Sequence, residues 1–190
     1  MVTIAKASVA DSRDIAQVYV DTWRSTYPGM LPDRVLVGMS PDRQAADWQW
    51  LIGNRAPTVP VVVARVAGHG VVGFSSSGQS RAADRLRAGP LADIAGEVFT
   101  LYVRPDFQNQ GVGRRLLGAS FAALRERGYA GAFLWVLSQS PSRFFYERMA
   151  GVRAAERRER LWGADVEETA YAWPNLAYAI DRIGSCSISE

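Results

Sequence analysis

The feature that most constrains the fold of this chain is a strand-like run that stops at a proline and leads through a glycine loop directly into a helical pattern. The run covers residues 97–103, Pro105 ends it, and the polar loop that follows contains Gly111 and Gly113. Main-chain N–H groups in such a loop and in the first helical turn have no intrahelical partner, and the helix dipole adds partial positive charge there. Glycine allows close approach to the backbone because it has no Cβ. The segment therefore predicts a phosphate-binding site, to which Arg114 adds charge.

Two common nucleotide-binding motifs do not fit this loop. A Walker A loop ends in Gly-Lys-Ser or Gly-Lys-Thr, whereas Gly113 is followed by Arg114 and Arg115. The Rossmann fingerprint needs a further Gly or Ala three residues after Gly113, and that position is Leu116. It also needs an acidic residue about twenty positions later, where the chain has Phe133 among apolar neighbours. Both motifs are therefore excluded.

Hydrophobic periodicity places helices and strands along the rest of the chain. Asp11 or Ser12 is expected to cap a first helix that Pro28 ends, and Ser40 is a good cap for another. The order of elements is β-α-α-β-β-β-α-β-α-β-β, which indicates an α/β (α+β) fold with a mixed sheet and helices on both faces. The predicted strands are 2–7, 59–66, 70–76, 97–103, 132–137, 155–161 and 167–173; the main predicted helices are 40–54, 113–127 and 141–149, with a short helix at 31–38, a long loop at 78–95, a turn at 163–165, a weakly helical tail to 183 and a frayed end at 184–190.

Length and composition suit one well-cored domain. The chain has 190 residues, of which 48% are apolar, so we expect a single domain over 1–190 with a core at about 2–175 and a tail at about 176–190. Charged residues interrupt the N-terminus before a signal-peptide region can form, and Arg65 and His69 interrupt the longest apolar stretch. Cys186 is the only cysteine, which excludes an internal disulfide and a cysteine-built zinc site. We therefore expect a cytoplasmic protein with no membrane contact and no bound metal.

Charge gives little support to a nucleic-acid-binding role. The net charge is +3, from 22 basic and 19 acidic residues, and every basic residue except Lys6 is an arginine. These arginines are spread along the chain and mixed with Asp and Glu rather than gathered in one stripe. We therefore expect no nucleic-acid partner and interpret the arginine excess as a compositional bias.

The glycine loop and its flanking residues resemble the cofactor motif of the GNAT superfamily of N-acetyltransferases. The family pattern Gln/Arg-x-x-Gly-x-Gly/Ala matches from Gln108 to Gly113, and the similarity extends over residues 101–117. A second block, 134–149, resembles the family's strand, Asn-Pro turn and helix bearing Phe-Tyr-Glu-Arg. The likeness as a whole covers roughly residues 2–175.

The resemblance implies a fold and a cofactor site. The fold is a mixed, mostly antiparallel sheet of six to seven strands with a V-shaped splay between the central strands 97–103 and 132–137. Acetyl-CoA, the acyl donor, is expected in the V, with its pantetheine arm along the first of these strands and its pyrophosphate on the glycine loop. Where this chain has Ser140 the family often has Asn, whose longer side chain reaches further. The expected cofactor-binding residues are Leu101, Tyr102, Val103, Gln108, Asn109, Gln110, Gly111, Val112, Gly113, Arg114 and Ser140.

Acetylation of an amine makes three chemical demands, and the resemblance suggests a group for each. A Lys-like amine near pKa 10.4 must lose a proton, and Glu97, acting through water, is the candidate base. Negative charge on the acyl oxygen needs an N–H donor, most simply from a bulged strand at 101–103. The departing thiolate needs a proton or a hydrogen bond, for which Tyr146 is the candidate donor. The alternatives for these two residues are a packed tyrosine and a solvated carboxylate at a strand end.

The resemblance also places the acceptor pocket under the first helices. Trp23 and Tyr27 are expected to line it, although core packing explains most aromatic residues of this region, and Arg24 is a candidate for binding an acidic group on the acceptor. His69, in a Gly-His-Gly turn, is expected to be exposed. We therefore expect an acetyl-CoA-dependent N-acetyltransferase that acts on a primary amine of a small molecule or peptide by direct attack on the thioester. The alternative is a CoA-binding GNAT-like domain with a regulatory or interaction role and no turnover; homodimers are common in the family.

Overall fold

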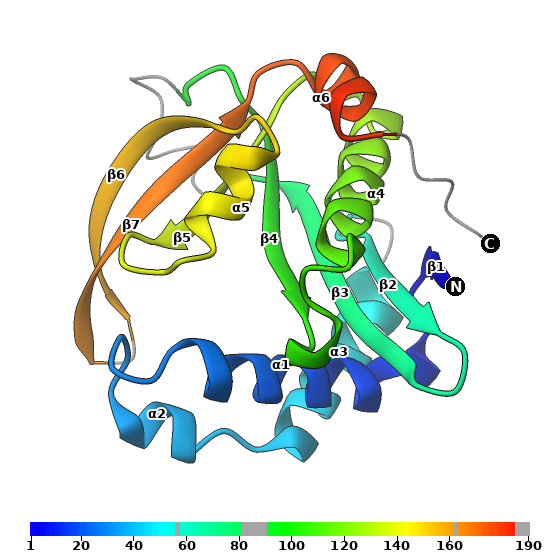
Figure 1. Cartoon of the computed structure of the whole chain (residues 1–190), viewed down its shortest axis with the longest axis vertical. Helices are drawn as coiled ribbons and strands as arrows, with labels where there is room; N and C mark the ends of the chain where they lie inside the picture. The colour runs from blue at the N-terminus through cyan, green and yellow to red at the C-terminus, as the bar shows by residue number, and fades with distance from the viewer. Residues whose placement is uncertain (56–57, 81–90, 162, 185–190) are drawn as a thin grey trace.

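The computed structural model describes residues 1–55, 58–80, 91–161 and 163–184 (Figure 1). The strands are β1 (Val2–Lys6), β2 (Val61–Val66), β3 (Gly70–Gln79), β4 (Gly96–Val103), β5 (Ala132–Leu137), β6 (Val152–Leu161) and β7 (Ala164–Trp173). They form one seven-stranded sheet in the order β1-β2-β3-β4-β5-β7-β6. All neighbouring strands are antiparallel except β4 and β5, which are parallel. The predicted mixed, mostly antiparallel sheet is confirmed.

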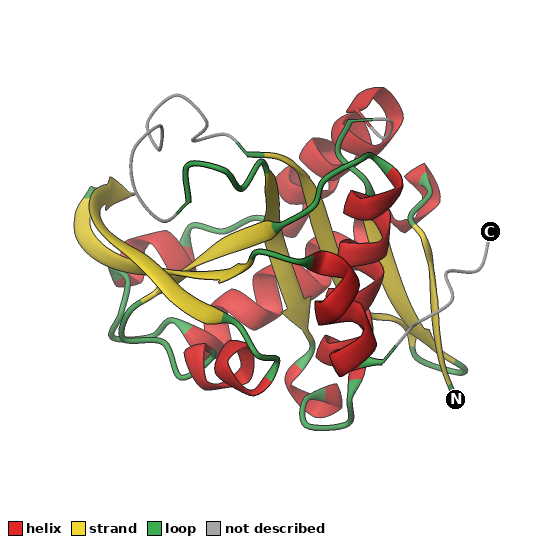
Figure 2. Cartoon of the chain, turned by 90° about the horizontal axis from the view of Figure 1, so that it is seen from above, coloured by secondary structure: helices red, strands yellow, loops and turns green. Residues whose placement is uncertain are grey.

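Helices cover both faces of this sheet, as predicted (Figures 1 and 2). The helices are α1 (Ser12–Thr26), α2 (Asp33–Val37), α3 (Pro41–Arg55), α4 (Val112–Glu126), α5 (Arg143–Arg148) and α6 (Leu176–Ile183), with 3₁₀ turns η1 (Val9–Asp11) and η2 (Pro105–Phe107). Side chains of α1 and α3 pack on one face of β2 and β3, and those of α4 pack on the opposite face of β1 to β3. No helix in the described ranges is long and apolar enough to cross a membrane.

The residue predicted to cap α3 forms its side-chain hydrogen bond, whereas the predicted cap of α1 does not. The Ser40 hydroxyl accepts the Arg43 N–H at 3.3 Å, so the predicted cap of α3 is confirmed. Asp11, one of the two residues predicted to cap α1, occupies its N-cap position, but its side chain makes no hydrogen bond to the helix. Asp11 Oδ2 accepts the Ser8 N–H at 2.8 Å, and the Ser12 hydroxyl donates to a carbonyl of η1 at 2.7 Å. Because both side chains bond backward, they stabilise the 3₁₀ turn that precedes the helix.

β3 is longer than its sequence pattern indicated and ends at Gln79. Serines usually mark loops, but the three serines at 75–77 are buried in the sheet. Buried hydroxyls need hydrogen-bond partners, and Ser75 finds one by donating to the Thr100 carbonyl at 2.7 Å. The middle of the loop predicted at 78–95 lies outside the described residues.

The end of the chain is also more regular than predicted. β6 ends at Leu161 and β7 begins at Ala164, inside the turn predicted at 163–165, and both strands are longer than expected. The tail forms α6, which Asn175 caps by accepting the Tyr178 N–H at 3.0 Å. Cys186 and most of the segment predicted to fray lie outside the described residues.

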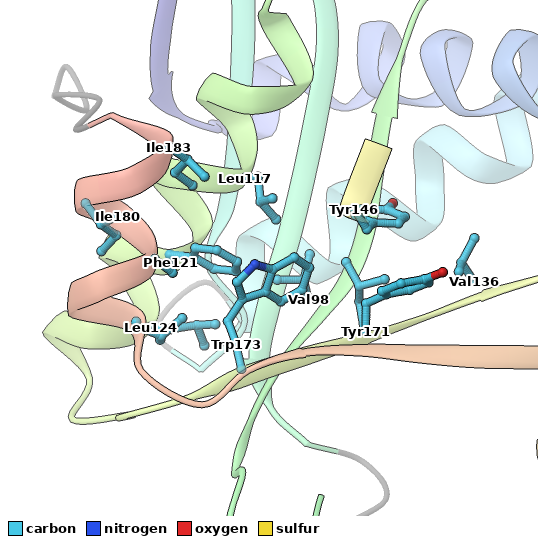
Figure 3. Close-up of a cluster of buried hydrophobic side chains, with 14 residues drawn as sticks. Val98, Leu117, Phe121, Leu124, Val136, Tyr146, Tyr171, Trp173, Ile180 and Ile183 are labelled. Atoms are coloured by element: carbon cyan, nitrogen blue, oxygen red, sulfur yellow. The ribbon is translucent and has the colours of Figure 1, made fainter. Parts of the chain in front are cut away.

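A cluster of buried side chains joins α4 and α6 to β5 and β7 (Figure 3). The rings of Phe121 and Trp173 lie 5.0 Å apart at its centre. Ile180 lies toward one end of the cluster, and Tyr146 and Tyr171 lie at the other (Figure 3). The cluster therefore fixes α5, which carries Tyr146, on the main core of the molecule.

Candidate active site

The two central strands separate to form a V. β4 and β5 pair only at Gly96 with Ala132 and at Glu97 with Phe133, and no later residue of either strand is paired with the other. Both strands continue for several residues beyond this point. The splay predicted between the central strands is therefore present, with Glu97 at its vertex.

The backbone of β4 directs polar groups into this V. The Arg104 N–H donates to the Val72 carbonyl at 2.8 Å, and residues that bond across an antiparallel ladder alternate with residues that do not. Leu101 and Val103 therefore turn their N–H and C=O groups away from β3 and toward the gap. Gln108 Nε2 already donates to the Val103 carbonyl at 3.0 Å. The main-chain N–H and C=O of Leu101 and the main-chain N–H of Val103 therefore face the gap between β4 and β5.

A bulge in β4 lies closer to the vertex than predicted. The register with β3 shifts next to Ser76, which leaves Phe99 as the extra residue, so the bulge expected at 101–103 is wrong. One extra residue reverses the faces to which later side chains point. Leu101 consequently packs toward α4, while Tyr102 packs toward α1 and α3.

The loop between β4 and α4 presents main-chain amides without protein partners. Asn109 and Gly111 adopt left-handed conformations, with φ of 58° and 79°. In the described part of the chain, no N–H from Asn109 to Arg114 donates to a protein acceptor, whereas those of Gln108 and Arg115 do. Left-handed residues within such a turn gather N–H groups into an anion-binding concavity, and the dipole of α4 adds to it. A Cβ on Gly111 would meet no atom within 4 Å, so the space before the loop is open.

Three residues predicted to bind the cofactor do not line the cavity. Gln110 donates its side-chain N–H to the Asp106 carbonyl at 2.9 Å and stabilises the loop. Val112 is the first residue of α4 and its side chain is buried against the sheet, so only its amide is left to face the site. Ser140 is fully buried, does not line the cavity, and accepts the Ser142 N–H at 3.3 Å. The structure therefore places Ser140 as a support for the start of α5, because its short side chain is satisfied locally.

One large cavity fills the V and extends from the glycine loop to the end of α1. Its volume is about 1290 Å³, which exceeds the roughly 300–1,000 Å³ of a typical ligand pocket and leaves room for two substrates. Within the described ranges, no group of three His, Cys, Asp or Glu side chains is placed to share a metal ion. The predicted site residues that line the cavity are Trp23, Tyr27, Glu97, Leu101, Tyr102, Val103, Gln108, Asn109, Gly111, Gly113, Arg114 and Tyr146.

Similarity to known proteins agrees with this geometry. The model of the acetyltransferase (GNAT) family matches residues 15–152 of the chain. The chain belongs to the GNAT family. A relative from Bacillus subtilis (strain 168), named uncharacterized N-acetyltransferase YuaI, is 32% identical over 177 residues, which are 93% of this chain and 95% of that protein.

Solved structures share the GNAT fold of this chain. The Salmonella typhimurium putative acetyltransferase yncA, with its cofactor acetyl-CoA, has a TM-score of 0.67 at 23% identity and covers 93% of this chain and 94% of its own. The PaiA N-acetyltransferase of Thermoplasma acidophilum, in complex with coenzyme A, has a TM-score of 0.62 at 18% identity and covers 89% of this chain and 98% of its own. As a family member, the chain is an acetyl-CoA-dependent N-acetyltransferase, which confirms the predicted enzyme class and acyl donor.

In this GNAT enzyme, Tyr146 lies on the cavity wall supplied by α5. Its side chain is 8% exposed and packs between Phe145 and Tyr171, with ring centroids 5.2 and 6.0 Å away. Burial, and then the neighbouring Tyr27 phenol, raise the pKa of Tyr146 above its ordinary value. The hydroxyl therefore stays protonated at neutral pH and is able to donate a hydrogen bond into the cavity.

The end of α1 supplies an aromatic wall across the cavity from α5. The rings of Trp23 and Tyr27 lie 5.1 Å apart, and those of Tyr19 and Tyr102 lie 5.4 Å apart. Burial raises the pKa of Tyr27 and of Tyr102, so both phenols are neutral. Both aromatic residues predicted for the acceptor pocket, Trp23 and Tyr27, line the cavity.

Two other residues considered from the sequence lie elsewhere. Arg24 does not line the cavity, because its guanidinium donates to the carbonyls of Leu36 and Met39 at 3.2 and 2.9 Å. It fixes the segment around α2 and does not face the cavity. His69 is exposed, as predicted, with its ring 5.1 Å from that of Phe107.

The last strands add three cavity residues that sequence reasoning missed: Trp135, Arg157 and Glu168. The Arg157 guanidinium lies over the Trp135 ring, 4.1 Å from its centroid, and donates to Glu168 at 2.7 Å. Arg157 and Glu168 face each other across β6 and β7. Only the register of this hairpin could have revealed the pair, and a turn at 163–165 would pair different residues.

Proposed function

We propose that this enzyme transfers the acetyl group of acetyl-CoA to a primary amine of a small molecule or peptide, by direct attack of the amine on the thioester. The observation that supports this is a single cavity that reaches from the amide-lined loop to the aromatic wall through the gap between β4 and β5. Donor and acceptor can therefore meet there. The described residues that line it include no cysteine or histidine, the side chains that most often form a nucleophile and its base.

Main-chain groups are expected to hold the donor. The amides from Asn109 to Arg114 would bind the pyrophosphate, and the backbone of Leu101 and Val103 would pair with the pantetheine as an added strand does. A Cβ on Gly113 would lie 3.3 Å from an aromatic ring of α5, so glycine there allows the first turn of α4 to pack closely on α5. Acetyl-CoA supplies an activated acyl group as a thioester.

Tyr146 is expected to assist the departing sulfur by hydrogen bonding. A phenol near pKa 10 is a weaker acid than a thiol near 8.5, so full proton transfer would be uphill by about 2 kcal/mol at these values. Burial raises the pKa of Tyr146 further, which makes complete transfer less favourable still. A hydrogen bond that strengthens as charge develops on sulfur remains the effective contribution.

Glu97 is the proposed base, acting through water. It lies at the vertex of the V, where the amine must approach the acyl carbon, and it lines the cavity. A carboxylate is a weak base for an ammonium ion, so its role is to lead the proton away through water as the bond forms. Full retention of rate by Glu97→Gln across the pH range would exclude this role.

A thiol-release assay with acetyl-CoA over a panel of primary amines and short peptides tests the proposal. We expect CoA release with at least one acceptor, an acetylated product by mass spectrometry, and a rise in melting temperature with acetyl-CoA. Acetyl-CoA binding without turnover of any amine would support a regulatory CoA-binding domain instead. Absence of any thermal shift would overturn the cofactor site itself.

A further inference from the structure

Glu168 is a buried carboxylate with one oxygen bound to the protein and one oxygen left over. Its side chain is 10% exposed, and its Oε2 atom accepts the Nε–H of Arg157 at 2.7 Å. The Nη2 atom of the same guanidinium lies 2.7 Å from Oε2 and completes the ion pair. Among the described residues, none donates to Oε1. Glu168 lines the cavity, so a ligand in the cavity can reach this second oxygen. A carboxylate oxygen accepts hydrogen bonds, and a bound acceptor molecule can supply the donor that this oxygen lacks among the described residues.

Arg157 does not neutralise Glu168 completely. Its Nη2 atom also lies 3.1 Å from Glu159 Oε2, so one guanidinium is shared between two carboxylates. The same guanidinium is stacked on Trp135, which holds it against the wall. The arrangement therefore favours another positive charge beside Glu168 and leaves little of the arginine's charge for a carboxylate on the acceptor.

The surroundings of Glu168 suit a cation on an aliphatic chain. Trp23 and Tyr27 line the same cavity, and aromatic faces attract ammonium groups and cover methylene groups. Burial chiefly, and also the charge of Glu168, raise the pKa of Tyr27, so its phenol stays neutral. A neutral phenol adds no charge that would oppose Glu168.

The position of Glu168 sets it apart from the reacting centre. Glu168 pairs with Leu137 on β5, whereas Glu97 at the vertex pairs with Phe133. Four residues of strand separate these two positions, which corresponds to roughly 13 Å along β5 before the side chains reach inward. A group bound by Glu168 is therefore distinct from the amine that is acetylated near the vertex.

We propose that Glu168 binds a positively charged N–H group of the acceptor, so that the enzyme selects basic acceptors with a second cation several bonds from the reacting amine. This inference rests on the proposed function and names the acceptor class for the same site. It predicts that a neutral amine binds less well than a diamine, and that an amino acid whose carboxylate takes the place of the second cation is disfavoured.

Matched acceptors test the inference without any variant. For chains of three to eight methylenes, kcat/KM is measured with the α,ω-diamine, the monoalkylamine and the ω-amino acid of equal length. We expect one diamine length to exceed its monoalkylamine by about tenfold or more, as a charge-assisted hydrogen bond allows. Equal values for diamine and monoalkylamine at every length, or a preference for the amino acids, would overturn the inference and leave the proposed function intact.

A pair of neighbouring variants identifies the residue responsible. Glu168→Gln keeps the size of the side chain and removes its charge, so the diamine-to-monoalkylamine ratio should fall to about one. Glu167→Gln is the matched control, because Glu167 pairs with Arg158, has a 59% exposed side chain and does not line the cavity. The thermal shift with acetyl-CoA shows that each variant is folded. An unchanged ratio in Glu168→Gln would remove Glu168 from recognition, whereas no turnover of any amine by the wild type would contradict the proposed function.

Discussion

At the scale of single residues, Tyr146 is expected to contribute to turnover and not to donor binding. Tyr146→Phe removes one hydroxyl from the cavity wall, so kcat should fall at least tenfold with little change in acetyl-CoA affinity. Because burial raises the pKa of Tyr146, its ionisation should cause no loss of rate below about pH 10. Tyr171→Phe is the control, since that hydroxyl donates to Glu147 at 2.7 Å outside the cavity. Steady-state kinetics with unchanged kcat in Tyr146→Phe would exclude the role.

Asp11 provides a residue-scale prediction for stability. Burial alone would raise the pKa of Asp11, but hydrogen bonds from Ser8 and Arg65 outweigh it and hold this pKa below its ordinary value. A lowered folded-state pKa adds stability above the unfolded value near 3.9, and that stability is lost as the pH falls further. Asp11→Asn should lower the free energy of unfolding at pH 7 by about 1 kcal/mol, because the Arg65 end is 40% exposed and screened.

Urea unfolding at pH 7 and pH 3 measures this effect. The difference in the free energy of unfolding between wild type and Asp11→Asn should be smaller at pH 3, because the wild-type carboxyl is then increasingly protonated and resembles the amide. Asp93→Asn is the control, because Asp93 is exposed. This substitution should change the free energy of unfolding only slightly at both pH values. If this difference in the free energy of unfolding were equally large at pH 3, the proposed link between stability and the pKa of Asp11 would be contradicted.

At the scale of elements, the glycine loop and the start of α4 act as one binding unit. Gly111 and Gly128 flank α4, both have left-handed φ (79° and 86°), and a Cβ on either would meet no atom within 4 Å. Gly111→Ala and Gly128→Ala should therefore cost similar stability, about 1–2 kcal/mol each. Only Gly111→Ala places a methyl group before the unpaired amides, so it alone should weaken acetyl-CoA binding, by tenfold or more in a titration. Equal affinities of the two variants would show that the loop does not hold the donor.

The sequence predicted elements well where the signal is local. The strand, proline, glycine loop and helix around Gly111 follow one another without a gap, so the amide site was predictable from spacing and end effects alone. The bulge at Phe99, the buried serines at 75–77 and the pairing of Arg157 with Glu168 were not predicted. Each depends on the register between strands, which the alternation of side chains along one strand does not determine.

At the scale of the whole molecule, the V exists because the two halves of the sheet are joined by very little pairing between β4 and β5. β1 to β4 pack with α1, α3 and α4, while β5 and β7 pack with α4, α5 and α6. Among the described strands, the pairing between these two groups is confined to Gly96 with Ala132 and Glu97 with Phe133. A full ladder between β4 and β5 would close the gap that the cavity occupies. The large separation of the strand ends is therefore as much a part of the site as the residues that line it.

The junction of these two groups is tight, which gives the last prediction. A Cβ on Gly96 would lie 2.6 Å from the Gly131 carbonyl oxygen and 3.4 Å from a methyl group of Leu124, so Gly96→Ala must shift the backbone where β4 meets β5. Overpacking of this kind should lower the free energy of unfolding by about 1–3 kcal/mol. Because the angle of the V is set at this vertex, acetyl-CoA affinity should fall as well. Gly53→Ala in α3, whose nearest neighbour would be 3.8 Å away, should be neutral or stabilising by up to about 1 kcal/mol. Urea unfolding and acetyl-CoA titration of both variants measure the two effects. If Gly96→Ala is destabilised but binds acetyl-CoA as tightly as the wild type, the loop and the β4 backbone hold the donor independently of the angle at the vertex.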